Sequence, residues 1–297
     1  MATWKTVTVG TTGTYATLNA AQAAEATDLT AQSGDLVISC QNFEDTTQAV
    51  FASTAWDSDA THRVVIQAAD NHLGKWSTSA YRMVGATSRI VNQAVNYMKL
   101  EGVQINLTGA GTNARGYQAD SPLDAVGETE IDKLIVVGPS SPTAPDGVNN
   151  SEPLHDIYIR NSVLYSLQIG IGNAGTGSKI YADNITIDDC LIGVSDSYGS
   201  HRLRNCRVTN CPTVKDGGGT LDSGSDYNLT NSTGAVPTNW GSNSISSTDS
   251  PTINYVDDSS TNLVDRDYHI LAGDSGIGAG VNLSTSFTDD IDGDTRG

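Results

Sequence analysis

The sequence predicts an all-β fold in which the chain winds into stacked coils. Three segments, 155–163, 183–191 and 200–208, can be overlaid, and in each of them apolar residues alternate with polar ones. Alternation of this kind is the period of a half-buried strand. Each segment then has a polar pair ending in Asn or Asp and a small residue before an apolar restart: Ser162, Cys190 or Cys206. A strand, a corner and a second strand that return along the chain make one turn of a coil.

The composition agrees with a β-rich chain that has many turns. Of its 297 residues, 37% are apolar and 17% are charged, and 30 are Gly. The copies return at irregular intervals, which favours coils with loops of variable length over a strict short repeat. Stacked coils bury their faces only against their neighbours and count as one domain. We therefore predict a single domain over 1–297, with a cap at 1–45, central coils at 46–215, and looser coils and a closing segment at 216–297.

The first 45 residues predict a strand, a helix and a second strand. Valine alternates with threonine in 6–9, and an apolar strand follows at 36–40. Between them, 15–29 is rich in Ala, which has the highest helix propensity. A stack of coils has an open end whose backbone groups and apolar interior would otherwise meet water. We expect the helix at 15–29 to cover that end.

Further strands are predicted at 62–68, 89–91, 97–105 and 131–138. In 97–105 the apolar residues alternate around Gly102, which takes the corner place that Ser162 holds later. The intervening segments are predicted to be loops, because they are rich in Gly, Ser, Thr or Pro. These are 108–116, 170–178, 195–200 and, with four of the eight prolines, the non-strand insertion 139–153.

The end of the chain carries a further pattern. Asp267-Tyr268-His269-Ile270, then 275–280 and 288–296, are similar to the run "Y.L...S..I.AG......D.DG..R" that closes many bacterial and phage β-helix proteins. With the repeated coils and the N-terminal helix, this pattern resembles the right-handed parallel β-helix of the pectate-lyase-like superfamily. The resemblance covers most of the chain and implies a solenoid with an N-terminal capping α-helix. It implies no single activity, because that fold hosts lyases, hydrolases, adhesins and viral spikes.

The charge balance excludes one class of partner. The formal net charge is -18, from 34 acidic and 16 basic residues, and nucleic-acid binding needs positive charge against the phosphates. The acidity serves solubility or binds divalent cations along acidic turns. Asp290, Asp292 and Asp294 are weak calcium candidates, since no later Glu completes the ligand set and the resembling family has a structural turn here. No other cofactor is expected.

The four cysteines, Cys40, Cys190, Cys206 and Cys211, match no zinc spacing. In the overlay Cys190 and Cys206 share the corner position, so we expect them to stack as small buried residues. A disulfide from Cys206 to Cys190 or Cys211 stays open, and reduced thiols are the favoured reading. The N-terminus lacks the apolar region of a signal peptide, and no apolar run has the length of a membrane span. We expect cytoplasmic synthesis and a virion or extracellular location.

Two kinds of polysaccharide chemistry can be searched for in the sequence. A lyase needs a base beside a uronate carboxylate and a cation to neutralise that carboxylate. The candidates are Arg160, Lys179, Tyr181, His201, Arg202 and Arg204. Arg202 and Arg204 have the same parity and share a strand face, where surface arginines are also expected simply to cover the coil edge.

A glycosidase needs two carboxylates roughly 5 to 10 Å apart, and coils stacked about 4.8 Å apart bring many acids within that range. The available acids are Asp156, Asp183, Asp188, Asp189 and Asp196. Aromatic residues could stack on sugars or pack at coil ends: Trp56, Trp76, Tyr181, Tyr198 and Trp240.

Three functions are compatible with these patterns. The first is a virion-associated structural protein, tailspike-like, fibre-like or capsid-decorating, which forms a homotrimer and presents a rigid surface to another virion protein or a host glycan. The second is a secreted or virion-borne lyase or glycoside hydrolase that acts on an acidic polysaccharide. The third is an adhesin that binds glycan without cleaving it.

Overall fold

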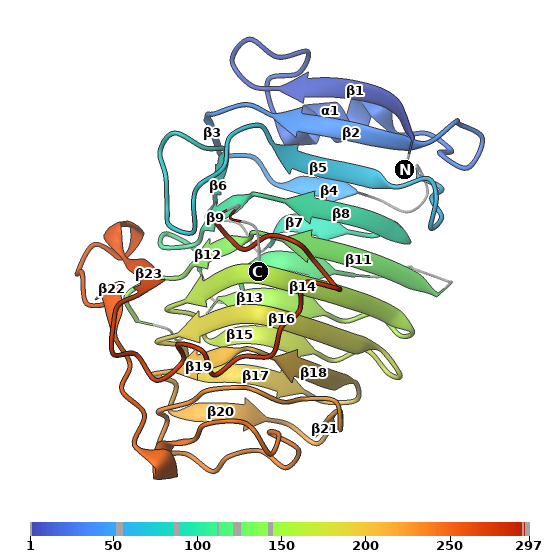
Figure 1. Cartoon of the computed structure of the whole chain (residues 1–297). Helices are drawn as coiled ribbons and strands as arrows, with labels where there is room; N and C mark the ends of the chain where they lie inside the picture. The colour runs from blue at the N-terminus through green and yellow to red at the C-terminus, as the bar shows by residue number, and fades with distance from the viewer. Residues whose placement is uncertain are drawn as a thin grey trace.

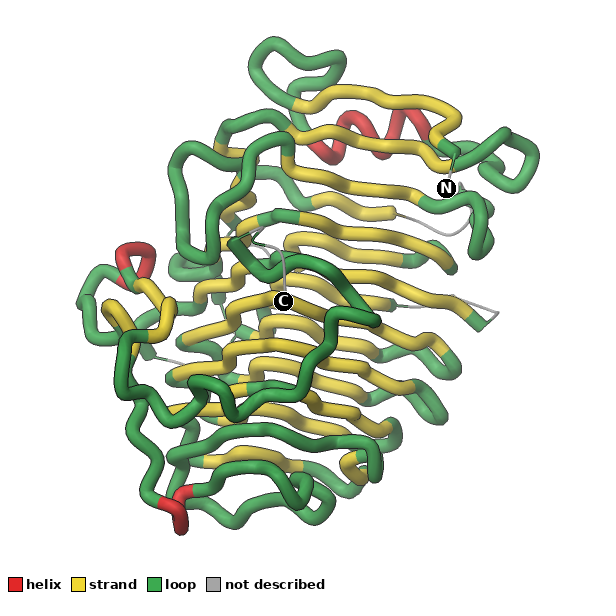
Figure 2. The backbone as a smooth tube through the Cα atoms, in the orientation of Figure 1, coloured by secondary structure: helices red, strands yellow, loops and turns green. Residues whose placement is uncertain are grey.

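The computed structural model confirms the all-β class and has almost all of its strands in parallel (Figures 1 and 2). It describes residues 2–51, 56–85, 89–111, 113–120, 126–141, 145–292 and 294. Parts of the predicted loops 108–116 and 139–153, and residues 293 and 295–297 of the closing segment, lie outside this range. Parallel sheets in which the chain returns again and again to the same layer are compatible with a β-helix.

The chain visits three faces in a fixed order. The first face contains β1 (Thr3–Val9), β2 (Asp35–Cys40), β5 (Val64–Ala68), β8 (Tyr97–Glu101), β11 (Gly127–Asp132), β14 (His155–Tyr165), β16 (Lys179–Asp188), β18 (Ser200–Arg204) and β21 (Thr220–Leu221). The second contains β3 (Glu44–Asp45), β6 (Arg82–Val84), β9 (Gln104–Asn106), β12 (Ile135–Val137), the ends of β14 and β16, and β19 (Arg207–Thr209). The third contains β4 (Ala49–Phe51), β7 (Arg89–Gln93), β10 (Arg115–Ala119), β13 (Asp146–Asn150), β15 (Ile169–Asn173), β17 (Ile192–Asp196) and β20 (Thr213–Asp216).

The corner between the first and second faces is a column of left-handed residues. It comprises Gly102, Lys133, Asn161, Asn184, Asn205 and Tyr227, all with φ between 48° and 70°. Gly and Asn adopt this conformation at the lowest cost. Side-chain hydrogen bonds join the middle of the column, since Asn184 donates to Asn161 (2.8 Å) and Asn161 donates to Asp132 (3.1 Å), the residue before Lys133. We call it the first corner column.

The overlay of the central segments predicted from the sequence is wrong for one of them. Strand β16 pairs with β14 so that Asp183 faces Arg160 and Ile185 faces Ser162. Residues 183–191 therefore span two corners, and Cys190 follows the second one, which is also left-handed. Cys190 lies beside Cys211, whereas Cys206 follows the first corner. All four cysteines are buried and free.

The third face was largely missed, because β10, β13, β15 and β17 fall wholly or partly in segments predicted to be loops. Four of its strands carry Gly at the same position: Gly116, Gly147, Gly170 and Gly193. A Cβ on Gly147 would lie 2.6 Å from the carbonyl oxygen of Gly170, and one on Gly193 would lie 2.4 Å from a methyl of Val208. The column is glycine because the neighbouring strands leave no room for a side chain.

Helix α1 (Leu18–Glu25) is shorter than the predicted 15–29. Thr17 caps it, accepting a hydrogen bond from the Ala20 amide at 3.1 Å, as Ser and Thr do at helix starts. The helix contacts β1, β2 and β4 and buries Leu18 and Ala21 in the main core. No helix in the described ranges is long and apolar enough to cross a bilayer.

The C-terminal part of the chain folds back over the parallel strands. The antiparallel hairpin of β22 (Tyr255–Asp257) and β23 (Asp267–Ile270) packs on the second face and forms a separate apolar cluster. Two 3-10 turns, Ser247–Asp249 and Leu263–Asp265, flank these strands. The segment after the hairpin crosses the first face in front of β14 and β16 (Figure 1). We call residues 281–292 of it the C-terminal strap.

Candidate functional site

The candidate site lies on the outer surface of the first face, where β8, β11, β14, β16 and β18 run in register. Side chains alternate across a strand, so residues two apart point the same way. The central outward row contains Lys99, Glu130, Tyr158, Tyr181 and Arg202. We call it the tyrosine row.

The tyrosine row contains an aromatic stack with a cation at its end. The rings of Tyr158 and Tyr181 lie 4.6 Å apart between centroids and are tilted by 11°. The Arg202 guanidinium lies 4.6 Å from the centroid of Tyr181, within the range of a cation–π contact. Tyr158 is 38% exposed, and partial burial, followed by the charge of Glu128, raises its pKa to about 12. Tyr181 lies between Tyr158 and Arg202 in the register, so both faces of its ring are covered and the stack presents the edges of its rings to solvent.

One neighbouring row is a ladder of ion pairs. Arg160 pairs with Asp132 at 2.9 Å, and Arg204 pairs with Asp183 at 2.6 Å. Arg202 reaches the same Asp183 carboxylate at 3.2 Å. The hydrogen bond from Arg204 to Asp183 raises the pKa of that guanidinium. The guanidinium groups of this row are therefore all paired with carboxylates in the contacts given above.

The other neighbouring row contains two adjacent carboxylates. Glu128 faces Asp156 in the register of β11 and β14, and strands in one sheet lie about 4.8 Å apart. Burial is the main cause that raises the pKa of each carboxyl. Glu128 also contacts Arg63 (3.4 Å), and Asp156 accepts a hydrogen bond from the Lys179 amide (2.8 Å). We call Glu128 and Asp156 the carboxylate pair.

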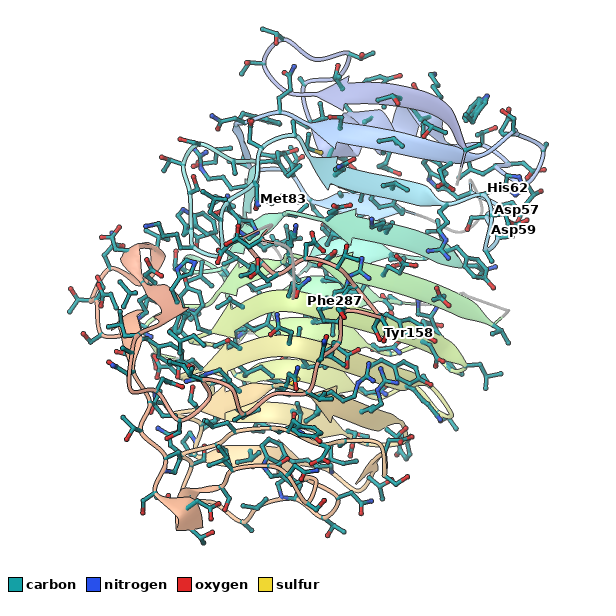
Figure 3. The ribbon with its side chains drawn as sticks, viewed as in Figure 1. Asp57, Asp59, His62, Met83, Tyr158 and Phe287 are labelled. Atoms are coloured by element: carbon teal, nitrogen blue, oxygen red, sulfur yellow. The ribbon has the colours of Figure 1, made fainter. Side chains whose placement is uncertain are left out.

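The C-terminal strap borders this surface. Lys133 pairs with Asp289 at 2.5 Å, and Asn161 donates to the Asp289 carbonyl at 3.3 Å. The Arg160 guanidinium lies 5.8 Å from the centroid of Phe287. Figure 3 shows Phe287 and Tyr158 near each other over the middle strands. The strap therefore bounds the surface on its ion-pair side.

Five of the six lyase candidates lie on the outer surface of this face: Arg160, Lys179, Tyr181, Arg202 and Arg204. Lys179 is about half exposed and lies 3.8 Å from Asp222. Arg202 and Arg204 both point outward with Leu203 buried between them, as their parity predicts. Tyr158 was missed, although "Ile-Tyr-x-x-Asn" occurs at both 157–161 and 180–184 and aligns the two tyrosines.

His201 is not at the surface. Its side chain is fully buried, 3.3 Å from Asp196 through Nδ1, and its Nε2 has no partner among the described residues. Lys215 closes this group with an ion pair to Asp196 at 3.0 Å. Burial lowers the pKa of His201. This histidine belongs to the interior and cannot reach a ligand on the tyrosine row.

Asp188 and Asp189 lie apart from the face, at the second corner beneath the hairpin. Asp188 is buried and accepts hydrogen bonds from Thr209 (2.6 Å), Asn210 (2.8 Å) and Tyr268 (3.2 Å). Burial raises its pKa to about 6 in spite of these donors. Asp189 pairs with Arg266 at 2.9 Å. Both carboxylates anchor the C-terminal part of the chain.

The calcium candidates are engaged in other contacts. Asp290 accepts hydrogen bonds from the amides of Asp292 (3.0 Å) and Asp294 (2.9 Å), which is the geometry of a turn. The Asp292 carboxylate contacts Nε2 of His269 at 2.8 Å. Among the residues that the structure describes, no group of three or more His, Cys, Asp or Glu side chains could hold a metal ion.

The other aromatic candidates are scattered. Trp56 and Trp240 are buried, and Trp76 packs on the cluster beneath the hairpin. Tyr198 is 72% exposed in the turn after β17. Only Tyr181 joins another ring on an open surface.

Comparisons with protein-family models, with curated proteins and with solved structures found no match.

Proposed function

We propose that the chain is a right-handed parallel β-helix of the pectate-lyase-like type, with α1 as its N-terminal cap. The repeated order of first, second and third face supports this reading. So do the contacts of α1 with β1, β2 and β4 at the start of the stack. A rod of this kind holds side chains on successive strands at fixed spacings, which suits the recognition of an extended ligand.

We propose further that the tyrosine row binds a glycan without cleaving it. The observation that carries this proposal is the exposed Tyr158–Tyr181 stack. Aromatic side chains supply a rigid contact surface at low entropic cost, and a sugar ring can pack against the exposed ring edges of this stack. The neighbouring cations are neutralised by carboxylates, so the surface resembles a preformed binding platform more than an acid–base centre.

A virion-borne homotrimer is the setting that we propose for this platform. The acidic, polar composition and the resemblance to phage β-helix proteins support it. The test is the mass in solution by light scattering, where three chains are expected and a clean monomer would count against the assembly. That result would leave the glycan proposal standing, because the tyrosine row belongs to one chain.

The glycan proposal is tested by binding to a glycan array and titration of the best hit. Tyr181→Ala is expected to weaken binding at least tenfold, about 1.4 kcal/mol. Tyr198→Ala is the matched control, since it removes a more exposed tyrosine outside the row. Retention of full affinity by Tyr181→Ala and by Tyr158→Ala would rule the platform out.

The carboxylate pair supports a second candidate, an enzyme that acts on an acidic polysaccharide. Two carboxyl groups of raised pKa face each other on adjacent strands beside the tyrosine row, and a glycosidase needs two neighbouring carboxyl groups. Incubation with alginate or pectate, followed by reducing ends and unsaturated product absorbance, separates hydrolysis, elimination and plain binding. Turnover that is lost in both Glu128→Gln and Asp156→Asn would place this candidate first.

A further inference from the structure

The larger of two adjoining cavities lies beneath the closing segment, away from the tyrosine row. Its volume is about 440 Å³, within the roughly 300–1,000 Å³ of pockets that bury small organic ligands. One wall is the first corner column, and the other is the loop 276–283, which overlaps the segment 275–280 of the closing run. A second cavity of about 290 Å³ joins it at Asn184, Arg207 and Ile270.

Tyr227 interrupts the corner column at this cavity. The preceding positions are Asn161, Asn184 and Asn205, and Asp226 bridges Arg204, which places Tyr227 beside Asn205. Tyr227 has φ 57°, a conformation that is strained for a bulky residue and cheap for Asn. The fold alone would favour Asn here. Instead the chain has an aromatic ring that lines the cavity.

Several polar groups in the wall of the cavity are neutral and are free to form hydrogen bonds with a ligand. The Oδ1 atoms of Asn184 and Asn243 and the hydroxyl of Tyr227 have no hydrogen-bond partner among the described residues. The charged residue in the wall is occupied, since both Nη atoms of Arg207 hold Asp274 at 2.7 Å and its Nε donates to Tyr255 at 3.2 Å. Amide and hydroxyl groups that face solvent can exchange their waters for ligand hydroxyls.

The closing loop holds its place through one residue of the column. Asn205 accepts from the Val281 amide and donates to the Val281 carbonyl, both at 2.8 Å. Leu229 and Ile245 add apolar surface to the lining. The cavity thus combines one aromatic ring, amides, a hydroxyl and apolar side chains, with no unpaired charge in its described lining.

We propose that this cavity is a binding site for a small neutral carbohydrate, with Tyr227 as the residue that stacks on the sugar ring. The inference is independent of the tyrosine row. The variant that tests it most directly is Tyr227→Asn, which gives this position the same residue type as the preceding column positions Asn161, Asn184 and Asn205. This variant is expected to melt at a higher temperature and to bind at least tenfold more weakly, so lost binding cannot be attributed to unfolding. Tyr227→Phe keeps the ring and is expected to retain most of the affinity.

The test is calorimetric titration with maltotetraose, cellotetraose and chitotetraose, and with tetragalacturonate as the acidic comparison. At least one neutral chain is expected to bind wild-type protein and the Tyr181→Ala variant equally, which separates this cavity from the tyrosine row. Tyr198→Ala is the control for a tyrosine outside the cavity. The proposal is overturned if no neutral chain binds, if Tyr227→Asn binds as wild type does, or if tetragalacturonate binds more tightly there than every neutral chain.

Discussion

Two groups of tyrosines that meet on strand β14 have opposite environments. Tyr158 and Tyr165 both lie on β14, on either side of the corner at Asn161. Tyr158 is 38% exposed and stacks on Tyr181, whereas Tyr165 is 1% exposed and packs against Tyr268 of the hairpin, 5.0 Å between ring centroids. The strands supply similar residues on both faces. The difference comes from the C-terminal hairpin, which covers the second face and leaves the tyrosine row open.

The charges beside the two groups differ in the same way. On the open face Asp183 pairs with Arg204, whose side chain remains partly exposed. Beneath the hairpin the Asp188 side chain is almost completely buried, and this burial raises its pKa to about 6. A covered polar group must be satisfied within the protein, whereas an open one can exchange water for a ligand. The covered group therefore serves stability and the open group is free to serve recognition.

The largest expected effect is the loss of a covered ring. Tyr268→Ala removes contacts with Tyr165 and Tyr255 and the hydrogen bond to Asp188. Truncation of a buried aromatic costs about 3–5 kcal/mol, measured as a loss in the free energy of unfolding in urea. Tyr158→Ala is the matched control and should cost less than about 1 kcal/mol. Equal losses in the two variants would erase the contrast between the faces.

The next effect is the pH dependence that Asp188 contributes. Its pKa is about 6 in the folded protein and about 3.9 when unfolded. The native state therefore binds this proton more tightly, so the contribution is fully present below about pH 4 and is lost as pH rises to about 6. Two pKa units correspond to about 2–3 kcal/mol.

Asp188→Asn removes this titration. The difference in unfolding free energy between wild type and variant should change by about that amount between pH 4 and pH 6 and then stay level. Asp216→Asn, at an exposed position, is the control for an Asp-to-Asn change outside the hairpin. A difference that is flat across this range would mean that Asp188 is hydrated in spite of the hairpin.

The first and second faces could be read from the sequence in part, and the third could not. Alternation of large apolar residues, as in 155–159, is visible in one dimension. The third face uses short strands whose second residue is Gly, such as 146–150 and 169–173, which have the composition of turns. They become strands because they pair with the strands of the coils before and after them, and the glycine column allows that close approach. This pairing joins segments that are far apart in the sequence, so the local sequence of each strand does not show it.

The two corners explain the error in the overlay. Asn161 and Asp189 are both left-handed residues followed by a turn into the next layer, so "polar pair, then small residue" describes each of them. Sequence spacing could not say which corner a given pair formed. The candidate site was predicted incompletely for the same reason: Arg160, Tyr181 and Arg204 were identified, but their register with Tyr158 was not. His201 shared their composition and proved to point inward.

A smaller effect is expected at the corner that separates the two tyrosine groups. Asn184 has φ 59° and donates to Asn161. Ala in a left-handed conformation costs about 1–2 kcal/mol, so Asn184→Ala should lower the free energy of unfolding by roughly that amount. Asn184→Gly loses the same hydrogen bond without the backbone cost and should be the milder variant. If Ala and Gly were equally damaging, the conformation would not be what selects Asn in this column.

The smallest effect concerns the C-terminal strap, which links the covered face to the open one. His269 of the hairpin contacts Asp267 through Nδ1 and Asp292 of the strap through Nε2, and Lys75 lies 3.5 Å from Asp267. Although burial opposes the charge, the hydrogen bonds that His269 donates to the carboxylates of Asp292 and Asp267 raise its pKa. A raised pKa means that this attachment is complete below about pH 6.5, the ordinary value, and is lost as pH rises through the folded value.

Hydrogen-exchange protection of the amides in 283–292 measures the strap directly. Protection factors, corrected for the intrinsic pH dependence of exchange, should fall several-fold as pH rises from 6 to 9. In His269→Gln they should be low and independent of pH, because a neutral amide cannot form the charged contacts. Lys133→Met is the companion variant, since it removes the ion pair with Asp289 and leaves His269 in place, and its loss should lower the protection of the strap. A strap whose protection depends on pH in His269→Gln as it does in wild type would show that the hairpin holds it by packing alone.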